Sequence, residues 1–311
     1  MNGAVFLDLK KAFDLVDHNI LIQKLSLYLQ NNQITTLLKS YLHERIQTVY
    51  MEGKYSEFRD ITVGVPQGSI LGPLLFCIYI NDLSLQISDP DAILELFADD
   101  STLHTASNDI NEIHNTLQNS INEVQDWCEH NRMILHPDKS KSMIITTRQK
   151  RQLYDLKLNL TIHNLPIEQV HHHKVLRIII DENLTWEKHI HQLYRQLSSN
   201  IFLLTKLKPY LNSSSLKLFF NAHILSRINY IDTIWSAAAE CHIKRINSLY
   251  RRGIKLVSSE KHIPVEKKMN NLNLLPLKDH FFFISVTLTF KALNNLAPKY
   301  LTECLQLSTR N

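Results

Sequence analysis

Three aspartates have the chemical type and the local setting of a cation-dependent site. Asp8 follows the apolar run Ala4–Leu7, and Asp99 and Asp100 stand together after the apolar segment 96–98. A carboxylate at the end of a buried strand is costly unless it is paired or bound to a cation. Carboxylate oxygens favour Mg²⁺, with Mn²⁺ as an alternative. Two such ions about 3.5–4 Å apart clamp the attacking and leaving oxygens of a phosphoryl transfer, which is the chemistry these residues predict.

The pair Asp99–Asp100 also has an ordinary explanation. Segment 95–104 is typical of a strand, a tight turn and a return strand. Short acidic side chains are common in such turns because they bond to their own backbone. The cation site therefore requires the strand that ends at Asp8 to lie beside this hairpin in one sheet.

Glycines single out another segment. The chain has six glycines, and half of them lie between Gly64 and Gly72. This concentration indicates backbone positions that no side chain can occupy. A helix is predicted from here to about Leu85, and its N-terminal amides would suit an anion. A plain loop leading into a helix is the alternative.

The remaining elements follow from hydrophobic spacing and turn residues. Strands are predicted at 4–9, 142–147 and 156–162, a hairpin at 47–52 and 56–63, and helices at 34–43, 110–131, 188–208, 213–230 and 241–257. Asp17 is predicted to cap the next helix, and 149–152 to be a solvated turn or linker. His171–His173 are predicted to lie in a solvated loop, because neighbours on a strand face opposite ways and cannot share a metal.

Charge is divided unevenly along the chain. Residues 1–135 contain 8 Lys/Arg and 18 Asp/Glu, whereas residues 136–311 contain 26 and 12. An acidic first part suits cations and a basic second part suits a phosphate backbone, although a differently solvated surface explains the division equally well. The four cysteines are scattered and none forms a Cys-x-x-Cys pair, so neither a zinc site nor a disulfide framework is indicated. No signal peptide or membrane-spanning run is present, so an intracellular protein of the cytoplasm and/or nucleus is expected.

Three segments now combine into one pattern. Phe6–Asp14, Gly64–Pro73 and Phe97–Asp100 resemble, in this order, motifs A, B and C of reverse transcriptases, and the flanking residues resemble those of non-LTR (LINE-type, Jockey-like) retrotransposons. The resemblance continues more weakly to about Leu305. It implies an RNA-directed DNA polymerase that adds dNTP to the 3′-OH of a DNA primer on an RNA template.

The resemblance also implies roles for single residues. Asp8 and Asp99 would bind both Mg²⁺ ions, Asp100 would support them, and the carbonyl of Leu9 would add a ligand.

Four further residues match family positions around the nucleotide. Phe13 would lie under the sugar and exclude a 2′-hydroxyl, and Gln67 and Gly68 would shape the nucleotide and template pocket. Lys139 resembles the motif D lysine, a general acid for the pyrophosphate leaving group. An exposed lysine in a polar turn is the alternative for Lys139.

The implied fold class is α+β. Residues 1–184 would form a polymerase palm, a small antiparallel sheet with helices on one face, followed by a helical thumb (185–260) and a C-terminal helical extension (261–311). A strand opens the chain almost at once, so the start is expected to be a truncation that removes the fingers. The family usually has Leu-Gly at Leu176–Arg177, the start of the primer-grip hairpin, and an arginine there places a long charged chain where backbone should approach closely.

Two other functions stay open. One is a catalytically inactive retrotransposon remnant that at most binds nucleic acid through its basic part, as the missing fingers and Arg177 indicate. The other is a helical interaction module built from residues 186–311. No membrane partner is expected, and the sequence leaves the oligomeric state open.

Overall fold

A computed structural model describes residues 1–29, 31–154, 156–258, 260, 262–303 and 305. The chain forms two compact units, Met1–Leu184 and Thr185–Asn311, and each is described by itself.

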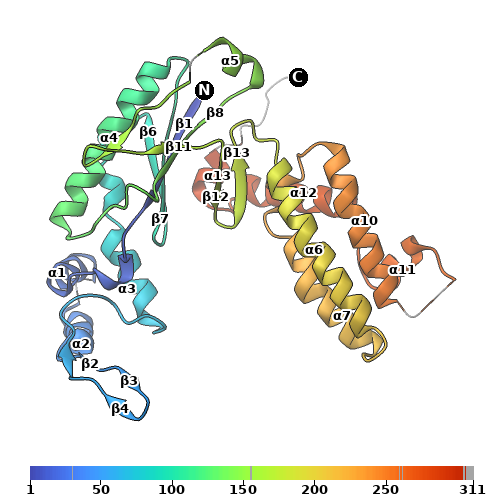
Figure 1. Cartoon of the computed structure of the whole chain (residues 1–311), viewed down its shortest axis with the longest axis horizontal. Coiled ribbons are helices and arrows are strands. Elements are labelled where there is room, and N and C mark those ends of the chain that lie inside the picture. The colour runs from blue at the N-terminus through green and yellow to red at the C-terminus, as the bar shows by residue number, and fades with distance from the viewer. Residues whose placement is uncertain (30, 155, 259, 261, 304, 306–311) are drawn as a thin grey trace. The chain divides into compact units, whose positions relative to one another are not determined.

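The first unit contains the described strands and the helices up to α5 (Figure 1). Its strands are β1 (Asn2–Asp8), β2 (Ile46–Gln47), β3 (Tyr50–Met51), β4 (Lys54–Tyr55), β5 (Arg59–Asp60), β6 (Ala92–Phe97), β7 (Asp100–Ala106), β8 (Lys141–Ile145), β9 (Thr161–Ile162), β10 (Leu165–Pro166), β11 (Glu168–Gln169), β12 (His172–Val175) and β13 (Ile178–Asp181). Its helices are η1 (Ala12–Asp14), α1 (His18–Leu29), α2 (Asn32–Leu42), α3 (Leu71–Ile80), η2 (Leu83–Gln86), α4 (Ile110–His130) and α5 (Arg148–Leu153).

The central sheet has five strands in the order β11-β8-β1-β7-β6. All neighbouring pairs are antiparallel except β11 and β8, which are parallel. The central strand β1 therefore lies between β7 and β8. This arrangement places the end of β1 beside the start of β7, the two points where the predicted carboxylates stand.

Alternation along β1 divides the two faces of the sheet. Val5 and Leu7 belong to the main core, which α4 closes by packing on β1, β6 and β7. Ala4 and Phe6 belong to a smaller cluster on the other face, with Met143. Helices thus cover one face, as the sequence predicts.

The hairpin of β12 and β13 packs on the other face. Val175 and Ile180 contact the cluster around Phe6, and the His173 ring stacks on the Phe6 ring with centroids 4.3 Å apart. The prediction of a solvated loop at His171–His173 is therefore wrong for His173, which lies half-buried in a strand. Its burial depends on a partner far away in the sequence, so local spacing did not reveal it.

Three other expectations need correction. Segment 149–152 is not a linker but part of α5, where Thr147 accepts a hydrogen bond from the Lys150 N–H and Arg151 pairs with Glu182. The helix expected to reach Leu85 ends at Ile80 and is followed by η2.

The predicted strand 156–162 is a strand only at β9. Residues 156, 158 and 160 are buried in alternation, as in a strand. The Gln169 side chain, however, bonds to the backbone of Leu156 and Leu158 in place of a neighbouring strand. A side chain thus satisfies backbone groups that a ladder would otherwise pair.

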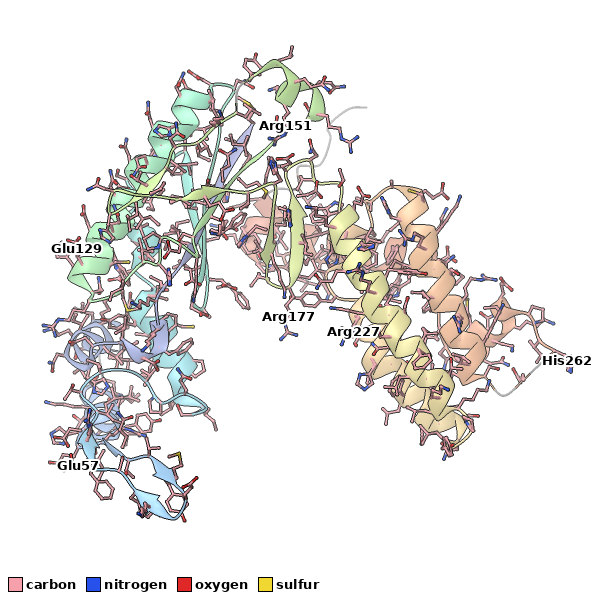
Figure 2. The ribbon with its side chains drawn as sticks, viewed as in Figure 1. Glu57, Glu129, Arg151, Arg177, Arg227 and His262 are labelled. Atoms are coloured by element: carbon pink, nitrogen blue, oxygen red, sulfur yellow. The ribbon has the colours of Figure 1, made fainter. Side chains whose placement is uncertain are left out.

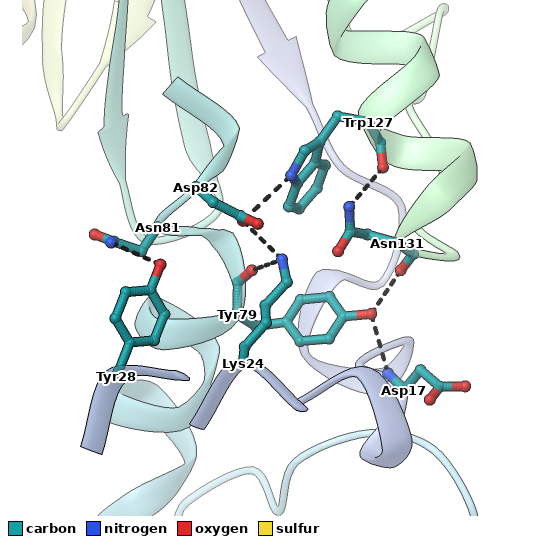
Figure 3. Close-up of polar contacts among 8 residues, drawn as sticks. All are labelled: Asp17, Lys24, Tyr28, Tyr79, Asn81, Asp82, Trp127 and Asn131. Atoms are coloured by element: carbon teal, nitrogen blue, oxygen red, sulfur yellow. Dashed lines mark hydrogen bonds and ion pairs between the residues drawn. The ribbon is translucent and has the colours of Figure 1, made fainter. Parts of the chain in front are cut away.

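A buried lysine joins α1 to the helix that follows motif B (Figure 3). The Lys24 ammonium donates to the Tyr79 carbonyl and to Asp82 Oδ1, both at 2.7 Å, and lies over the rings of Tyr79 and Trp127. Trp127 Nε1 also donates to Asp82 Oδ1. Burial lowers the pKa of Lys24, and Asp82 partly offsets that effect.

The same network reaches Asp17, which follows motif A and precedes α1. The Tyr79 hydroxyl donates to the Asn131 carbonyl at 2.6 Å and accepts from the Asp17 N–H. Asp17 caps α1 by accepting from the Asn19 and Ile20 N–H groups, as predicted, and pairs with Arg132 at 2.6 Å. These contacts join helices α1, α3 and α4 to one another.

The second unit is helical. Its elements are α6 (Glu187–Leu207), α7 (Ser213–Phe220), the π-helix η3 (Asn221–Leu225), α8 (Ser226–Ile228), α9 (Asp232–Trp235), α10 (Glu240–Val257), α11 (Val265–Asn271), α12 (Leu277–Leu293) and α13 (Lys299–Glu303). The predicted helix 213–230 is thus interrupted by a π-turn, and α6 packs against α10. Among the described residues, none of the helices combines the length and apolar content that a membrane crossing needs.

Candidate active site

The ends of β1 and β7 bring two predicted carboxylates together. Asp8 and Asp100 are direct partners in the antiparallel ladder. Partners in a ladder share a face, so both side chains belong to the face of Phe6, away from α4. The strand that ends at Asp8 thus lies beside the aspartate hairpin in one sheet, as the predicted cation site requires.

Asp99 lies just outside this ladder. It forms with Ala98 the turn between Phe97 and Asp100, and its side chain is exposed. Ala98 has φ 52°, a left-handed conformation that costs free energy in a residue with a Cβ atom. The hairpin thus forms as predicted, with Asp99 at its tip and Asp100 in the strand.

The carboxylates repel one another. Burial, Asp99 and Asp8, in decreasing order, raise the pKa of Asp100 above its ordinary value of 3.8. Oδ2 of Asp8 is shielded from solvent, yet no described residue donates a hydrogen bond to it. A buried carboxylate oxygen without a donor, next to like charges, is what a cation would relieve, so the residues fit one. Within the described residues, no group of three or more His, Cys, Asp or Glu is placed to hold a metal ion.

A short loop brings Lys139 to the same point. The His136 N–H donates to the Asp8 carbonyl at 2.8 Å, and the Asp8 N–H donates to Ser140 Oγ. The Lys139 ammonium lies 3.7 Å from Asp8 Oδ2. Asp8, Asp100 and Lys139 line one pocket of about 320 Å³.

Residues of motif B hold the segment after Asp8. The N–H of Gly64 donates to the Val16 carbonyl, and the N–H of Val65 to the Phe13 carbonyl. Gly64 has φ 88°, and a Cβ atom there would lie 2.9 Å from the Asp14 carbonyl oxygen. The glycine is thus required by the close approach of the two motif segments.

Of the residues predicted to surround the nucleotide, Lys139 lines the aspartate pocket, whereas Phe13, Gln67 and Gly68 do not. Phe13 is half-buried and stacks on Phe76 of α3, with centroids 4.5 Å apart. Gln67 donates from Nε2 to Asp14 Oδ1 at 2.8 Å, and both line a different pocket of about 630 Å³. Gly68 is exposed, with φ 81°.

Leu9 belongs to the main core. Its side chain is buried, and its backbone forms an antiparallel bridge with Leu135. This bridge continues the pairing of motif A with the segment that leads to Lys139.

Several residues that line the aspartate pocket were not singled out from the sequence. His173 and Lys174 of β12 line it together with Asp8 and Asp100. Burial lowers the pKa of His173, helped by Lys141 and His172. The sequence of His172–Val175 has no apolar–polar alternation, and the alternation of exposed and half-buried side chains appears only in the structure.

The Leu176–Arg177 turn joins β12 to β13. Leu176 has φ 45° and Arg177 φ 68°, so both lie in the left-handed region that the hairpin turn demands. Arg177 is exposed at the hairpin tip (Figure 2). The hairpin therefore forms with the arginine in place, at a conformational cost that a glycine would avoid.

The family model for reverse transcriptase (RNA-dependent DNA polymerase) matches residues 2–193. The chain belongs to this family. The matched residues include β1, the segment Gly64–Pro73, the aspartate hairpin and β12–β13, so the predicted membership of the reverse transcriptase family is confirmed.

Curated relatives are polymerases of mobile elements. The chain is 30% identical over 266 residues to the probable RNA-directed DNA polymerase from transposon BS of Drosophila melanogaster, which covers 82% of this chain and 29% of that protein. It is 27% identical over 264 residues to the RNA-directed DNA polymerase from mobile element jockey of Drosophila funebris, covering 82% and 28%. The predicted resemblance to Jockey-like non-LTR retrotransposons is thus confirmed. The chain spans less than a third of the length of these relatives.

Solved structures of telomerase also align with the chain. The apo telomerase from Candida tropicalis has a TM-score of 0.46 and 12% identity, covering 82% of this chain and 42% of that one. The telomerase from Candida albicans in complex with a fragment of telomeric RNA has a TM-score of 0.40, covering 98% and 50%. The fold class rests on the elements described above, which are α+β.

Proposed function

We propose that this chain provides the polymerase site of an RNA-directed DNA polymerase of a non-LTR retrotransposon. The observation that carries the proposal is the Asp8–Asp100 ladder pair, with Asp99 in the adjacent turn, inside a region that matches the reverse transcriptase family. Its substrates would be an RNA template, a DNA primer with a free 3′-OH, and dNTP.

Reverse transcriptases generally use divalent metal ions. In this chain Asp8, Asp99 and Asp100 would hold two Mg²⁺ ions, or Mn²⁺, with the Leu9 carbonyl as a further ligand. Such ions would supply Lewis-acid stabilisation of the attacking and leaving oxygens. Two observations support this assignment. Oδ2 of Asp8 is buried and accepts no hydrogen bond from a described residue, and the pKa of Asp100 is raised.

The other residues would bind and orient the nucleotide. Phe13 is held by Phe76, so its ring can exclude a 2′-hydroxyl without being displaced. The Asp14 carboxylate can only accept hydrogen bonds, so it keeps the Gln67 amide nitrogen on its own side and turns Gln67 Oε1 away from Asp14. Gly68 would leave room for template and nucleotide. Lys139 would donate a proton to the leaving pyrophosphate.

The same proposal assigns the parts of the chain. Residues 1–184 act as palm, 185–260 as thumb and 261–311 as a C-terminal helical extension. Exposed cations on α10 would contact the nucleic-acid backbone, and these are Lys244, Arg245, Arg252 and Lys255. The proposed compartment is the cytoplasm and/or the nucleus, where an RNA template and dNTP are available.

Primer extension tests the proposal. The purified chain is given a primed RNA template, labelled dNTP and Mg²⁺. Where the chain alone is inactive, the part of the transposon BS polymerase that lies outside the aligned region is added as a separate polypeptide. Incorporation is expected in wild type and is expected to vanish in Asp99→Asn. Asp126→Asn, a solvent-exposed change of equal charge on α4, serves as the control. Equal incorporation by wild type and Asp99→Asn would refute the assignment of the cation site.

A second function is a remnant that binds nucleic acid without catalysis. One observation favours it, the left-handed conformation of Arg177 in the β12–β13 turn. It predicts salt-dependent RNA binding that is the same in wild type and Asp99→Asn, with no incorporation by either.

A further inference from the structure

Lys139 is the cation that faces Asp8 Oδ2, the buried oxygen that accepts no hydrogen bond from a described residue. Its ammonium lies 3.7 Å from Asp8 Oδ2, within ion-pair range but too far for a hydrogen bond. The Lys139 side chain is 64% exposed, whereas the oxygen that it faces is shielded from solvent. The contact is therefore an electrostatic attraction without a hydrogen bond, and the exposed Lys139 side chain is free to move away from Asp8.

The backbone that carries Lys139 is tied to Asp8 itself. The Lys139 N–H donates to the His136 carbonyl, and the His136 N–H donates to the Asp8 carbonyl. Ser140 Oγ accepts from the Asp8 N–H and donates to the His136 carbonyl. The base of the side chain is thus fixed beside the carboxylate, while the ammonium sits at the end of a flexible four-carbon stem.

The neighbouring lysine behaves differently. Lys141 Nζ pairs with Glu168 Oε2 at 2.8 Å and donates to the Asp138 carbonyl. It is held by partners of its own, whereas Asp8 is the one partner that the structure describes for the Lys139 ammonium. Lys139 also lines the aspartate pocket, and Lys141 does not line it.

We propose that Lys139 is a stand-in counter-ion for Asp8, which a divalent cation displaces when it binds. The proposal rests on the cation site of the proposed function. A divalent ion bound to Asp8 repels the nearby Lys139 ammonium, so ion binding drives that ammonium off Asp8. The tethered backbone keeps the freed ammonium at the mouth of the pocket, where the phosphates of a nucleotide would lie. Cation binding thereby couples to the position of the proposed proton donor.

Cation affinity tests this coupling without catalysis. Free Mn²⁺ is titrated by electron paramagnetic resonance against wild type, Lys139→Gln and Lys10→Gln, in the full chain. Lys139→Gln is expected to bind Mn²⁺ about two- to fivefold more tightly than wild type, the fold-change for removal of one exposed ion pair. Lys10→Gln makes the same change in net charge two residues from Asp8, on an exposed side chain, and is expected to have the smaller effect.

A second measurement follows the lysine directly. In chain labelled with ¹⁵N-lysine, the Lys139 Nζ signal is expected to shift when Mg²⁺ is added to wild type and to be insensitive to Mg²⁺ in Asp8→Asn. Equal or weaker Mn²⁺ binding by Lys139→Gln, with saturable binding by wild type, would overturn the stand-in role and leave the cation site intact. No saturable Mn²⁺ binding by wild type would overturn both.

Discussion

Removal of one carboxylate from the Asp8–Asp100 pair is expected to stabilise the chain when divalent cations are absent. The two residues are direct partners in the ladder, so their Cβ atoms lie about 4.5–5.5 Å apart. Unit charges about 5 Å apart repel by about 0.8 kcal/mol in water and by about 3 kcal/mol at an effective dielectric constant of about 20. Asp100 is exposed and the Asp8 side chain is 40% exposed, so the lower figure applies. Asp100→Asn should therefore raise the free energy of unfolding by about 1 kcal/mol, or the melting temperature by about 2–4 °C.

The sign of the pH dependence follows from the raised pKa of Asp100. The folded chain holds the Asp100 proton more tightly than the unfolded chain does, so wild-type stability falls as pH rises from 3.8 through the raised value. Asp100→Asn has no carboxyl group at this position to titrate, so it does not lose stability in this way as pH rises. The difference in melting temperature between variant and wild type should thus be absent below that window and fully developed above it.

Calorimetry in EDTA and then in Mg²⁺ measures both effects. In EDTA the variant should melt higher than wild type, and Mg²⁺ should raise the melting temperature of wild type more than that of the variant. Asp126→Asn is the matched control and should change neither. A lower melting temperature of Asp100→Asn in EDTA, or an equal gain in Asp126→Asn, would contradict the view that the carboxylates repel one another.

Three further changes test other parts of the account. Lys24→Met should lower the free energy of unfolding in urea by about 3 kcal/mol, because it leaves the carboxylate of Asp82, which is only 31% exposed, without a cation beside it. Recovery of stability when Asp82→Leu is added would support this reason, and no loss in the single variant would contradict it. Arg177→Gly should raise the free energy of unfolding by about 1 kcal/mol, because φ 68° is unfavourable for a residue with a Cβ atom; a destabilised variant would show that the arginine makes compensating contacts. Phe13→Val should raise rNTP incorporation relative to dNTP in primer extension, and an unchanged ratio would remove Phe13 from the sugar site.

Local patterns predicted the parts of the site that depend on local sequence. The short apolar run 4–7 predicts β1, a strand covered on both faces, with its carboxylate at the end. The recurrence of apolar residues every three to four positions in 110–130 predicts α4. The hairpin at Ala98–Asp99 followed from its turn residues. The order of the three motifs then identified the family.

These local patterns could not predict which residues pair across the sheet. Whether Asp99 or Asp100 lies opposite Asp8 is a difference of one residue in register, and register is decided by the core face and the turn together. The burial of His173 depends on Phe6, and that of Lys24 on Tyr79 and Trp127, partners from other elements. In sequence both look like ordinary surface residues.

The most direct test of the central claim is the place where a divalent cation binds. Substoichiometric Mn²⁺ broadens the amide signals of nearby residues in a deuterated, ¹⁵N-labelled sample of the chain. The account predicts that the amides of Asp8, Asp99, Asp100 and Lys139 are lost first, and that Asp8→Asn prevents this loss. Broadening centred on other acidic residues, with those four amides unaffected, would contradict it.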